Sequence, residues 1–358
     1  MSQSATLRPE VRSLLHHGVV IPAHPLALNS ERKLDAVRQA ALTRYYLAAG
    51  SAGVAVGVHT TQFAIRQAGL YESVLRIGAE TVDEVAASTG KTLIKVAGVI
   101  GPTDQALAEA KVAANLGYDL ALVGLGGTTG WSDDDLVSHV RKISEVLPAF
   151  GFYLQPSVGG RPLPYSFWRK LAELEGVHAI KIAPFNRYQT IDVVRAVAES
   201  SRRDEIALYT GNDDNIVPDL LSAFRFDVGG TVVEKRIVGG LLGHWAAWNK
   251  SAVDILEQCR AAVAKPSDCS ALELLALGNS VTDSNDAFFD SRNSFLGSIA
   301  GIHEVLRRQG LLEGRWCLDP AEELSPGQLE EIDRVYAAYP QLNDDAFVAE
   351  HLDEWLGL

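Results

Sequence analysis

The residue best suited to chemistry in this chain is Lys181, near the end of the apolar run His178–Ile182. Isoleucines on both sides of Lys181 predict a buried strand, and therefore a partly desolvated lysine. Burial disfavours the ammonium form and lowers the pKa of the amine, which suits an amine that attacks a carbonyl carbon. A lysine held by a neighbouring carboxylate is the alternative, and position alone leaves both open.

A tyrosine, Tyr153, lies in the preceding apolar run, Gly151–Gln155. If the two runs form adjacent strands, Tyr153 and Lys181 are expected to face each other. A phenol there would shuttle the protons that carbinolamine formation and C–C cleavage require. A core tyrosine with a satisfied hydroxyl is the simpler alternative.

Several other residues have explanations that need no catalysis. Asp213 and Asp214 are two adjacent acids without a third ligand in sight, so a loop and helix-cap role is favoured over cation binding. The glycines of Gly124–Gly130 predict a tight turn into a helix rather than a phosphate loop. His59 follows a predicted strand but needs a partner before it has a role. Paired histidines are missing from the predicted strand ends, so a metal-dependent hydrolase is disfavoured and no metal or other cofactor is expected.

The elements that must position these side chains alternate between short β-branched runs and longer segments of helical period. Eight runs start about 27 to 40 residues apart, which is the spacing of one βα unit each. Continuous apolar runs suit parallel strands buried on both faces, and eight of them favour an α/β fold of the (β/α)8 TIM barrel type. The predicted strands are Gly18–Ala23, Ala52–Val58, Thr92–Gly98, Asp119–Gly124, Gly151–Gln155, His178–Ile182, Glu205–Tyr209 and Arg236–Leu242.

Start and stop signals delimit the helices. Ser30, Thr103 and Ser132 are predicted helix caps, and Gly50 and Gly117 are predicted C-terminal stops. The segment Phe224–Arg236 has two β-rich runs around Gly229-Gly230 and predicts a hairpin before the last strand. We expect a barrel over residues 1–245, followed by the last barrel helix and a C-terminal helical appendage over residues 246–358. The predicted helices of that part are Ala246–Val263, Ser270–Leu277, Ser294–Gln309, Pro326–Ala338 and Asp345–Trp355.

Composition limits the possible partners and location. A net charge of −13 argues against nucleic acid, whose phosphates would be repelled. No stretch of about 18 apolar residues predicts a membrane span, and Met1–Leu15 lacks the pattern of a signal peptide. Cys259, Cys269 and Cys317 have neither disulfide nor zinc spacing, so the expected location is the cytoplasm.

Local strings, taken in order, resemble the dihydrodipicolinate synthase/N-acetylneuraminate lyase family of class I aldolases from about Gly18 to about Tyr339. Tyr153–Pro156 is similar to the family's Tyr-Asn-Val-Pro, and His178–Lys181 to the strand that ends in its Schiff-base lysine. Further similar strings are Ala23–Leu26 after the first strand, Gly211–Asp214 after the seventh, and Gly301–Leu312, Asp319-Pro320 and Leu324-Ser325 in the C-terminal helices.

The resemblance implies Lys181 as the imine-forming residue, Tyr153 as the proton relay, and a homo-oligomer. It also implies substrate contacts from the loop His59-Thr60-Thr61, from Arg161, and from Gly211 and Asp213. The family's carboxylate loop has lost its glutamate here, the tyrosine after the fourth strand is missing, and Arg161 is displaced along the chain.

The sequence therefore predicts a Schiff-base lyase or aldolase acting on a 2-oxo acid such as pyruvate or a sugar-acid derivative. A sugar-acid dehydratase would use the same lysine and the same first step. The alternative class is a catalytically eroded barrel that binds a small carboxylate as a sensor or scaffold, which the altered carboxylate loop favours.

Overall fold

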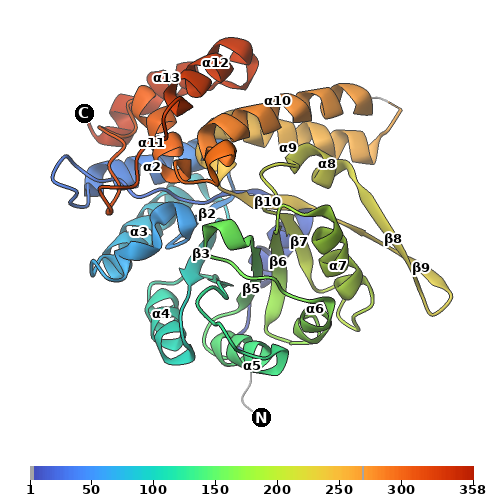
Figure 1. The fold of residues 1–358 in the computed structure, drawn as a ribbon. Coiled ribbons are helices and arrows are strands. Elements are labelled where there is room, and N and C mark those ends of the chain that lie inside the picture. Colours follow the sequence, from blue (N-terminus) through green and yellow to red (C-terminus); the bar gives the residue numbers. More distant parts are fainter. Residues whose placement is uncertain (1–3, 268–269) are drawn as a thin grey trace.

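The barrel consists of eight parallel strands in one sheet, in the order β1-β10-β7-β6-β5-β4-β3-β2, in a computed structural model that describes residues 4–267 and 270–358 (Figure 1). The two end strands meet through a parallel bridge between Ala23 and Ala55 and a hydrogen bond of 2.8 Å from the His24 N–H to the Ala55 carbonyl. Each strand overlaps its predicted run, so the predicted (β/α)8 barrel is confirmed. The strands are β1 (Val20–Pro22), β2 (Gly53–Val56), β3 (Ile94–Val99), β4 (Leu120–Val123), β5 (Ala149–Leu154), β6 (Val177–Ala183), β7 (Ala207–Thr210) and β10 (Gly239–Leu242).

Alternation along the strands divides the core into two layers, because successive side chains of a strand point to opposite faces. On β5, Phe150 and Phe152 belong to the barrel interior, whereas Tyr153 belongs to the layer between the sheet and the helices. The helix α1 (Pro9–His17) contributes Val11 and Leu15 to the interior layer.

A ring of helices surrounds the strands (Figure 1). Ser132 caps its helix as predicted, but two other caps differ. Asp35, not Ser30, accepts a hydrogen bond from the Arg38 N–H, so that helix starts later; Thr103 is the first residue of its helix rather than the cap. These helices are α2 (Ala36–Ala49), α3 (Tyr71–Thr89), α4 (Thr103–Asn115), α5 (Asp133–Ser144), α6 (Tyr165–Leu171), α7 (Arg187–Ala198), α8 (Ile216–Leu221) and α9 (Asn249–Ala264).

The predicted hairpin is confirmed as an antiparallel pair, β8 (Ala223–Val228) and β9 (Thr231–Arg236). Gly229 and Gly230 make its turn with φ of 62° and 83°, a conformation that glycine adopts without a steric cost. The hairpin projects from the barrel as an arm (Figure 1).

Four further helices form a C-terminal helical part above the barrel, α10 (Ala271–Phe289), α11 (Ser298–Arg308), α12 (Gln328–Ala338) and α13 (Asp345–Leu356) (Figure 1). The helix α10 continues twelve residues beyond its predicted end at Leu277, and α11 begins four residues after the predicted Ser294. The boundary between residues 245 and 246 stays a prediction. No helix among the described residues is long and apolar enough to cross a membrane.

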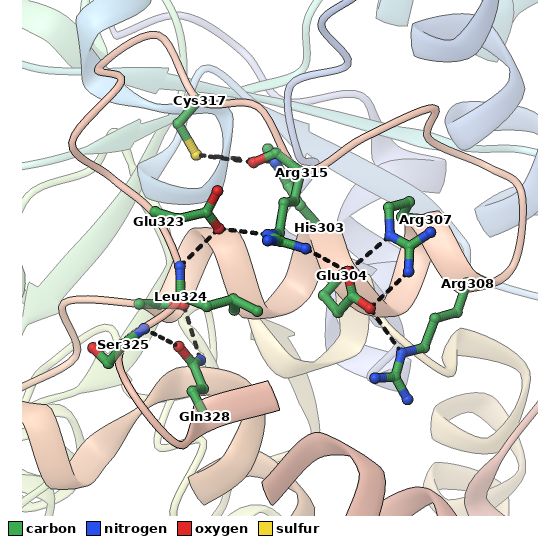
Figure 2. Close-up of polar contacts among 11 residues, drawn as sticks. His303, Glu304, Arg307, Arg308, Arg315, Cys317, Glu323, Leu324, Ser325 and Gln328 are labelled. Carbon is green, nitrogen blue, oxygen red and sulfur yellow. Dashed lines mark hydrogen bonds and ion pairs between the residues drawn. The ribbon is translucent and has the colours of Figure 1, made fainter. Parts of the chain in front are cut away.

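A buried carboxylate fixes α11. Glu304, whose side chain is 1% exposed, lies between the guanidinium groups of Arg307 at 2.8 Å, Arg308 at 3.0 Å and Arg315 at 3.3 Å (Figure 2). Arg315 also pairs with Glu323, so the ion cluster ties α11 to the segment that follows it. This matters for function because the start of α11 reaches the mouth of the barrel.

Candidate active site

A pocket of about 560 Å³, counting its open mouth, lies at the C-terminal end of the barrel. The ends of strands and the loops after them supply its inner wall, as expected for this fold. The outer wall comes from the end of β5 and the segment after it, from Phe185 after β6, and from the last turn of α10, the segment after it and the start of α11. The lining includes His59, Thr60, Phe152, Lys181, Gly211 and Asp213 on the inner side, and Phe185, Phe289, Phe295, Ser298 and Ile302 on the outer side.

Lys181 lies on β6 inside the barrel, where its register partner on β5 is Phe152. Its side chain is buried, and its Nζ is 4.6 Å from the centre of the Phe152 ring. Burial lowers the pKa of the amine, while the charge of Asp213 acts in the opposite direction. A substantial fraction of the amine is therefore unprotonated at mildly alkaline pH.

Asp213 is the carboxyl group of the pocket. It is buried, and its Oδ1 accepts a hydrogen bond of 2.8 Å from the His244 backbone N–H. Burial raises the pKa of Asp213, and the nearby Lys181 partly offsets that rise. The favoured helix-cap role for Asp213 is wrong, because Asn215 occupies the cap position of α8.

Gly211 lets the loop after β7 pass beside the lysine. A Cβ at this position would come within 2.6 Å of Lys181 Cε and 2.8 Å of Ala183 Cβ. The next residue, Asn212, fixes the loop by accepting from the Phe185 N–H at 3.1 Å and donating to Asp219 at 3.0 Å. In this string, Gly211 thus leaves space for the Lys181 side chain, and Asn212 fixes the loop that holds Asp213 in place.

The loop after β2 contributes only part of its predicted set. His59 and Thr60 line the pocket. Thr61 instead holds the loop together, since its hydroxyl donates to the His24 carbonyl at 2.6 Å and accepts from the Gly57 N–H at 3.0 Å. Burial, with a smaller effect of Lys181, lowers the pKa of His59 to about 4, so its imidazole is neutral at neutral pH.

The prediction that Tyr153 faces Lys181 is wrong. Tyr153 pairs in register with Ile182, one residue beyond Lys181, so its side chain points to the outer layer of the core. There its ring lies 5.3 Å from the Trp168 ring, and its hydroxyl accepts a hydrogen bond of 3.2 Å from the Leu163 N–H. Phe152 takes the inward position beside the lysine.

Arg161 does not reach the pocket either. Its guanidinium donates to the Thr128 carbonyl at 2.6 Å, to the Thr128 hydroxyl at 3.0 Å and to the Trp131 carbonyl at 3.4 Å. This arginine therefore holds the loop before α5, and it is not among the residues that line the pocket.

The aromatic outer wall was missed at the sequence level. Phe289, Phe295, Ser298 and Ile302 lie more than a hundred residues after Lys181, with no motif to connect them to it. Among the described residues, no group of three or more His, Cys, Asp or Glu side chains could hold a metal ion. Cys259 and Cys317 are free and buried, and Cys269 lies outside the described residues.

Comparison with curated proteins finds two lyase-family relatives, and no protein-family model matches the chain. N-acetylneuraminate lyase of Citrobacter koseri is 27% identical over 216 residues, which cover 59% of this chain and 68% of that protein. 4-Hydroxy-tetrahydrodipicolinate synthase of Cyanothece sp. is 29% identical over 174 residues, 48% of this chain and 56% of that protein. The matches thus span between a little over half and two thirds of these relatives.

Solved structures share the fold over nearly their whole length. Dihydrodipicolinate synthase of Bacillus anthracis has a TM-score of 0.72 at 18% identity, covering 90% of this chain and 99% of its own. N-acetylneuraminate lyase of Fusobacterium nucleatum has a TM-score of 0.69 at 15% identity, and the match covers 90% of this chain and 99% of that one. YagE of E. coli K12, solved in complex with pyruvate, has a TM-score of 0.71 at 16% identity, and the match covers 91% of this chain and 98% of that one.

Fold and pocket together define a (β/α)8 barrel with a buried amine among its strand ends. Within that class, the chain is similar in sequence to members of the dihydrodipicolinate synthase/N-acetylneuraminate lyase family and shares their fold.

Proposed function

We propose that this protein is a Schiff-base lyase or aldolase in which Lys181 forms an imine with the carbonyl carbon of a 2-oxo acid. The observation that carries the proposal is the buried Lys181 amine, whose pKa is lowered by desolvation, in a pocket at the strand ends. Attack of the amine on C2 gives a carbinolamine, and loss of water gives a protonated imine. The C4 hydroxyl then loses its proton, the imine accepts the electron pair of the breaking C3–C4 bond, and an aldehyde leaves. The remaining enamine takes a proton at C3, and water releases the shortened 2-oxo acid and the free amine.

Proton transfer falls to Asp213 rather than Tyr153 in this proposal. Because burial raises its pKa, Asp213 holds a proton at higher pH than an ordinary carboxyl and can both give and take one in the pocket. A protonated Asp213 also does not repel the carboxylate of the substrate. The Thr60 hydroxyl and the neutral His59 imidazole are the candidate partners for that carboxylate.

Borohydride reduction in the presence of pyruvate and a panel of longer 2-oxo acids tests the imine. The expected result is one covalent adduct per chain, mapped by peptide mass spectrometry to Lys181 and lost in Lys181→Ala. Lys95 is an internal control in the same digest, because it is equally buried but pairs with Asp83 at 2.6 Å outside the pocket. An unmodified Lys181 with every acid would overturn the proposal.

A carboxylate-binding protein without catalysis is the second candidate. It is favoured by one specific observation, that Tyr153 and Arg161 both lie outside the pocket. Calorimetric binding of pyruvate with no borohydride adduct would support this candidate. A dehydratase would form the adduct and release water from a sugar acid without C–C cleavage, so product analysis separates it from an aldolase.

Homo-oligomerisation and a cytoplasmic location remain part of the proposal. Sedimentation at micromolar concentration tests the first, and a single-chain mass would contradict it. Fractionation of the source cells tests the second.

A further inference from the structure

Two phenylalanines at the outer wall of the pocket have an unusual backbone conformation. Phe185, after β6, has a φ of 50°, and Phe295, between α10 and α11, has a φ of 67°. A positive φ is a clear outlier for a bulky side chain, and glycine would adopt it without strain. Strain of this kind persists only where the surrounding structure imposes it, and it concentrates at ligand-contacting sites.

The two strained residues are in direct contact. Their ring centres are 5.7 Å apart with an angle of 80° between the ring planes, an edge-to-face arrangement. Both side chains are half-buried, and both border the Lys181 pocket on one side and a shallower outer hollow on the other. The pair therefore separates the lysine from the outside of the molecule.

Polar contacts hold both phenylalanines in place from behind. The Phe185 N–H donates to Asn212 Oδ1 at 3.1 Å, and the Phe295 N–H donates to the Asp290 carbonyl at 3.0 Å. Asp290 in turn accepts from the Gly297 N–H at 3.0 Å and from the Ser325 hydroxyl at 2.5 Å. Ser325 also donates its N–H to Gln328, an interaction visible in Figure 2. The aromatic wall is thus rigidly preorganised.

The polar groups of the pocket gather at its inner end, and the outer part has few. Beside Phe185 and Phe295, the outer wall has Phe289, Ile302, Leu154 and Val158, with Ser298 and Gln155 as its polar side chains. A polyhydroxylated chain would leave most of its hydroxyls without partners there, which is costly in a desolvated site. No arginine and no lysine besides Lys181 lines the pocket among the described residues. The outer hollow is lined by Asp214, Asp283 and Asp286 and, in the part of the chain that the structure describes, by no arginine or lysine. Asp283 pairs with Arg334 at 2.7 Å and Asp286 with Arg292 at 3.1 Å, so these arginines are already engaged and the hollow offers no free cation to a second anionic group.

We infer that the part of the substrate beyond the imine carbon is an aromatic or bulky apolar group without a second negative charge. This inference rests on the proposed function. In the synthetic direction, the enamine of pyruvate on Lys181 attacks an apolar aldehyde. A bond forms between C3 of pyruvate and the aldehyde carbon, the aldehyde oxygen takes a proton, and hydrolysis releases a 4-hydroxy-2-oxo acid and the free amine.

The test compares benzaldehyde with glyceraldehyde as partners of pyruvate, with the condensation product quantified by mass spectrometry. We expect kcat/KM for benzaldehyde to exceed that for glyceraldehyde at least tenfold. Phe295→Ala and Phe185→Ala should each lower the ratio of the benzaldehyde value to the glyceraldehyde value at least tenfold. Leu296→Ala is the matched control, because this neighbour of Phe295 is 72% exposed and should have no effect.

Failure of the inference and failure of the proposed function give different results. A preference for glyceraldehyde, or unchanged benzaldehyde kinetics in both phenylalanine variants, overturns the apolar subsite while pyruvate trapping stands. Absence of trapping in the unaltered protein overturns the lyase itself. Calorimetry with 2-oxo-4-phenylbutanoate then tests the subsite without chemistry. Binding at least tenfold tighter than that of pyruvate, reduced in Phe295→Ala, supports the subsite, and equal binding overturns it.

Discussion

The buried carboxyl of Asp213 and the buried amine of Lys181 shift each other's protonation inside the barrel. The charge of Asp213 raises the pKa of Lys181 against the effect of burial, and Lys181 lowers the pKa of Asp213 in the same way. The His244 N–H fixes one oxygen of Asp213, and Gly211 leaves room for the lysine side chain. The pKa of the Lys181 amine therefore depends on two opposing effects, the desolvation that lowers it and the charge of Asp213 that raises it.

Replacing Asp213 by asparagine should move the pH dependence of imine formation to lower pH. The loss of the carboxylate removes the charge that raises the pKa of Lys181, so the amine becomes unprotonated at lower pH. One opposite charge close by is worth about one pH unit or more. The midpoint of the borohydride-trapping rate against pH measures the shift.

The same variant, Asp213→Asn, separates two roles of this side chain. The oxygen of the introduced amide can still accept from the His244 N–H, so the loop should keep its structure. Turnover should fall while trapping remains, because an amide cannot exchange protons as a carboxyl does. An unmoved midpoint would show that the Asp213 charge does not act on Lys181.

Gly211→Ala should slow trapping at least tenfold, because its Cβ would lie 2.6 Å from Lys181 Cε and force the side chain to move. Such overpacking costs roughly 1–3 kcal/mol of stability. Gly90→Ala is the control for that loss, since Gly90 has a φ of 69° and no atom within 4 Å of the added Cβ. If Gly211→Ala trapped the substrate on Lys181 as fast as Gly90→Ala does, the steric argument would be contradicted.

The barrel could be predicted because its signal is local. Each strand is a short apolar run, and the spacing of the runs reports the intervening helix, so all eight strands and the hairpin overlap their predicted ranges. Helix ends were less predictable, as with Ser30, since several polar residues before α2 are suitable caps and only tertiary structure selects Asp35.

Only the part of the site that a residue's immediate sequence neighbours reveal could be predicted. Lys181 is recognisable from its apolar neighbours, but the choice between Phe152 and Tyr153 depends on the register of β5 against β6. A shift of one residue exchanges the inward and outward side chains, and the pairing is irregular between Ala149 and Phe150. The outer wall depends on α10 and α11, whose position no local pattern reports.

Tyr153→Phe tests this register directly. Loss of the hydroxyl leaves the Leu163 N–H without its acceptor, so stability should fall by about 1 kcal/mol, while trapping and turnover should not change. Phe152→Ala is the paired variant, because it opens space beneath the Lys181 amine and should alter the trapping rate. Slower turnover in Tyr153→Phe without a matching loss of stability would restore the tyrosine to the mechanism.

Glu304→Gln should lower the stability of the protein at neutral pH and have little effect in acid. The ion pairs with Arg307 and Arg308 outweigh burial and lower the pKa of Glu304 from 4.5 to about 2. A carboxyl with a depressed folded-state pKa stabilises the fold above its unfolded value, and this contribution is lost as the pH falls from about 4.5 towards 2. Unfolding by urea at pH 7 should show a loss on the order of 2 kcal/mol, because the arginines are partly exposed and solvent moderates the effect. The difference from the unaltered protein should shrink below pH 4.

Glu330→Gln is the control, because it is the same chemical change at an exposed position of α12. It should change neither the stability at pH 7 nor the dependence of stability on pH. An equal effect of the two variants would mean that the Glu304 cluster does not stabilise α11.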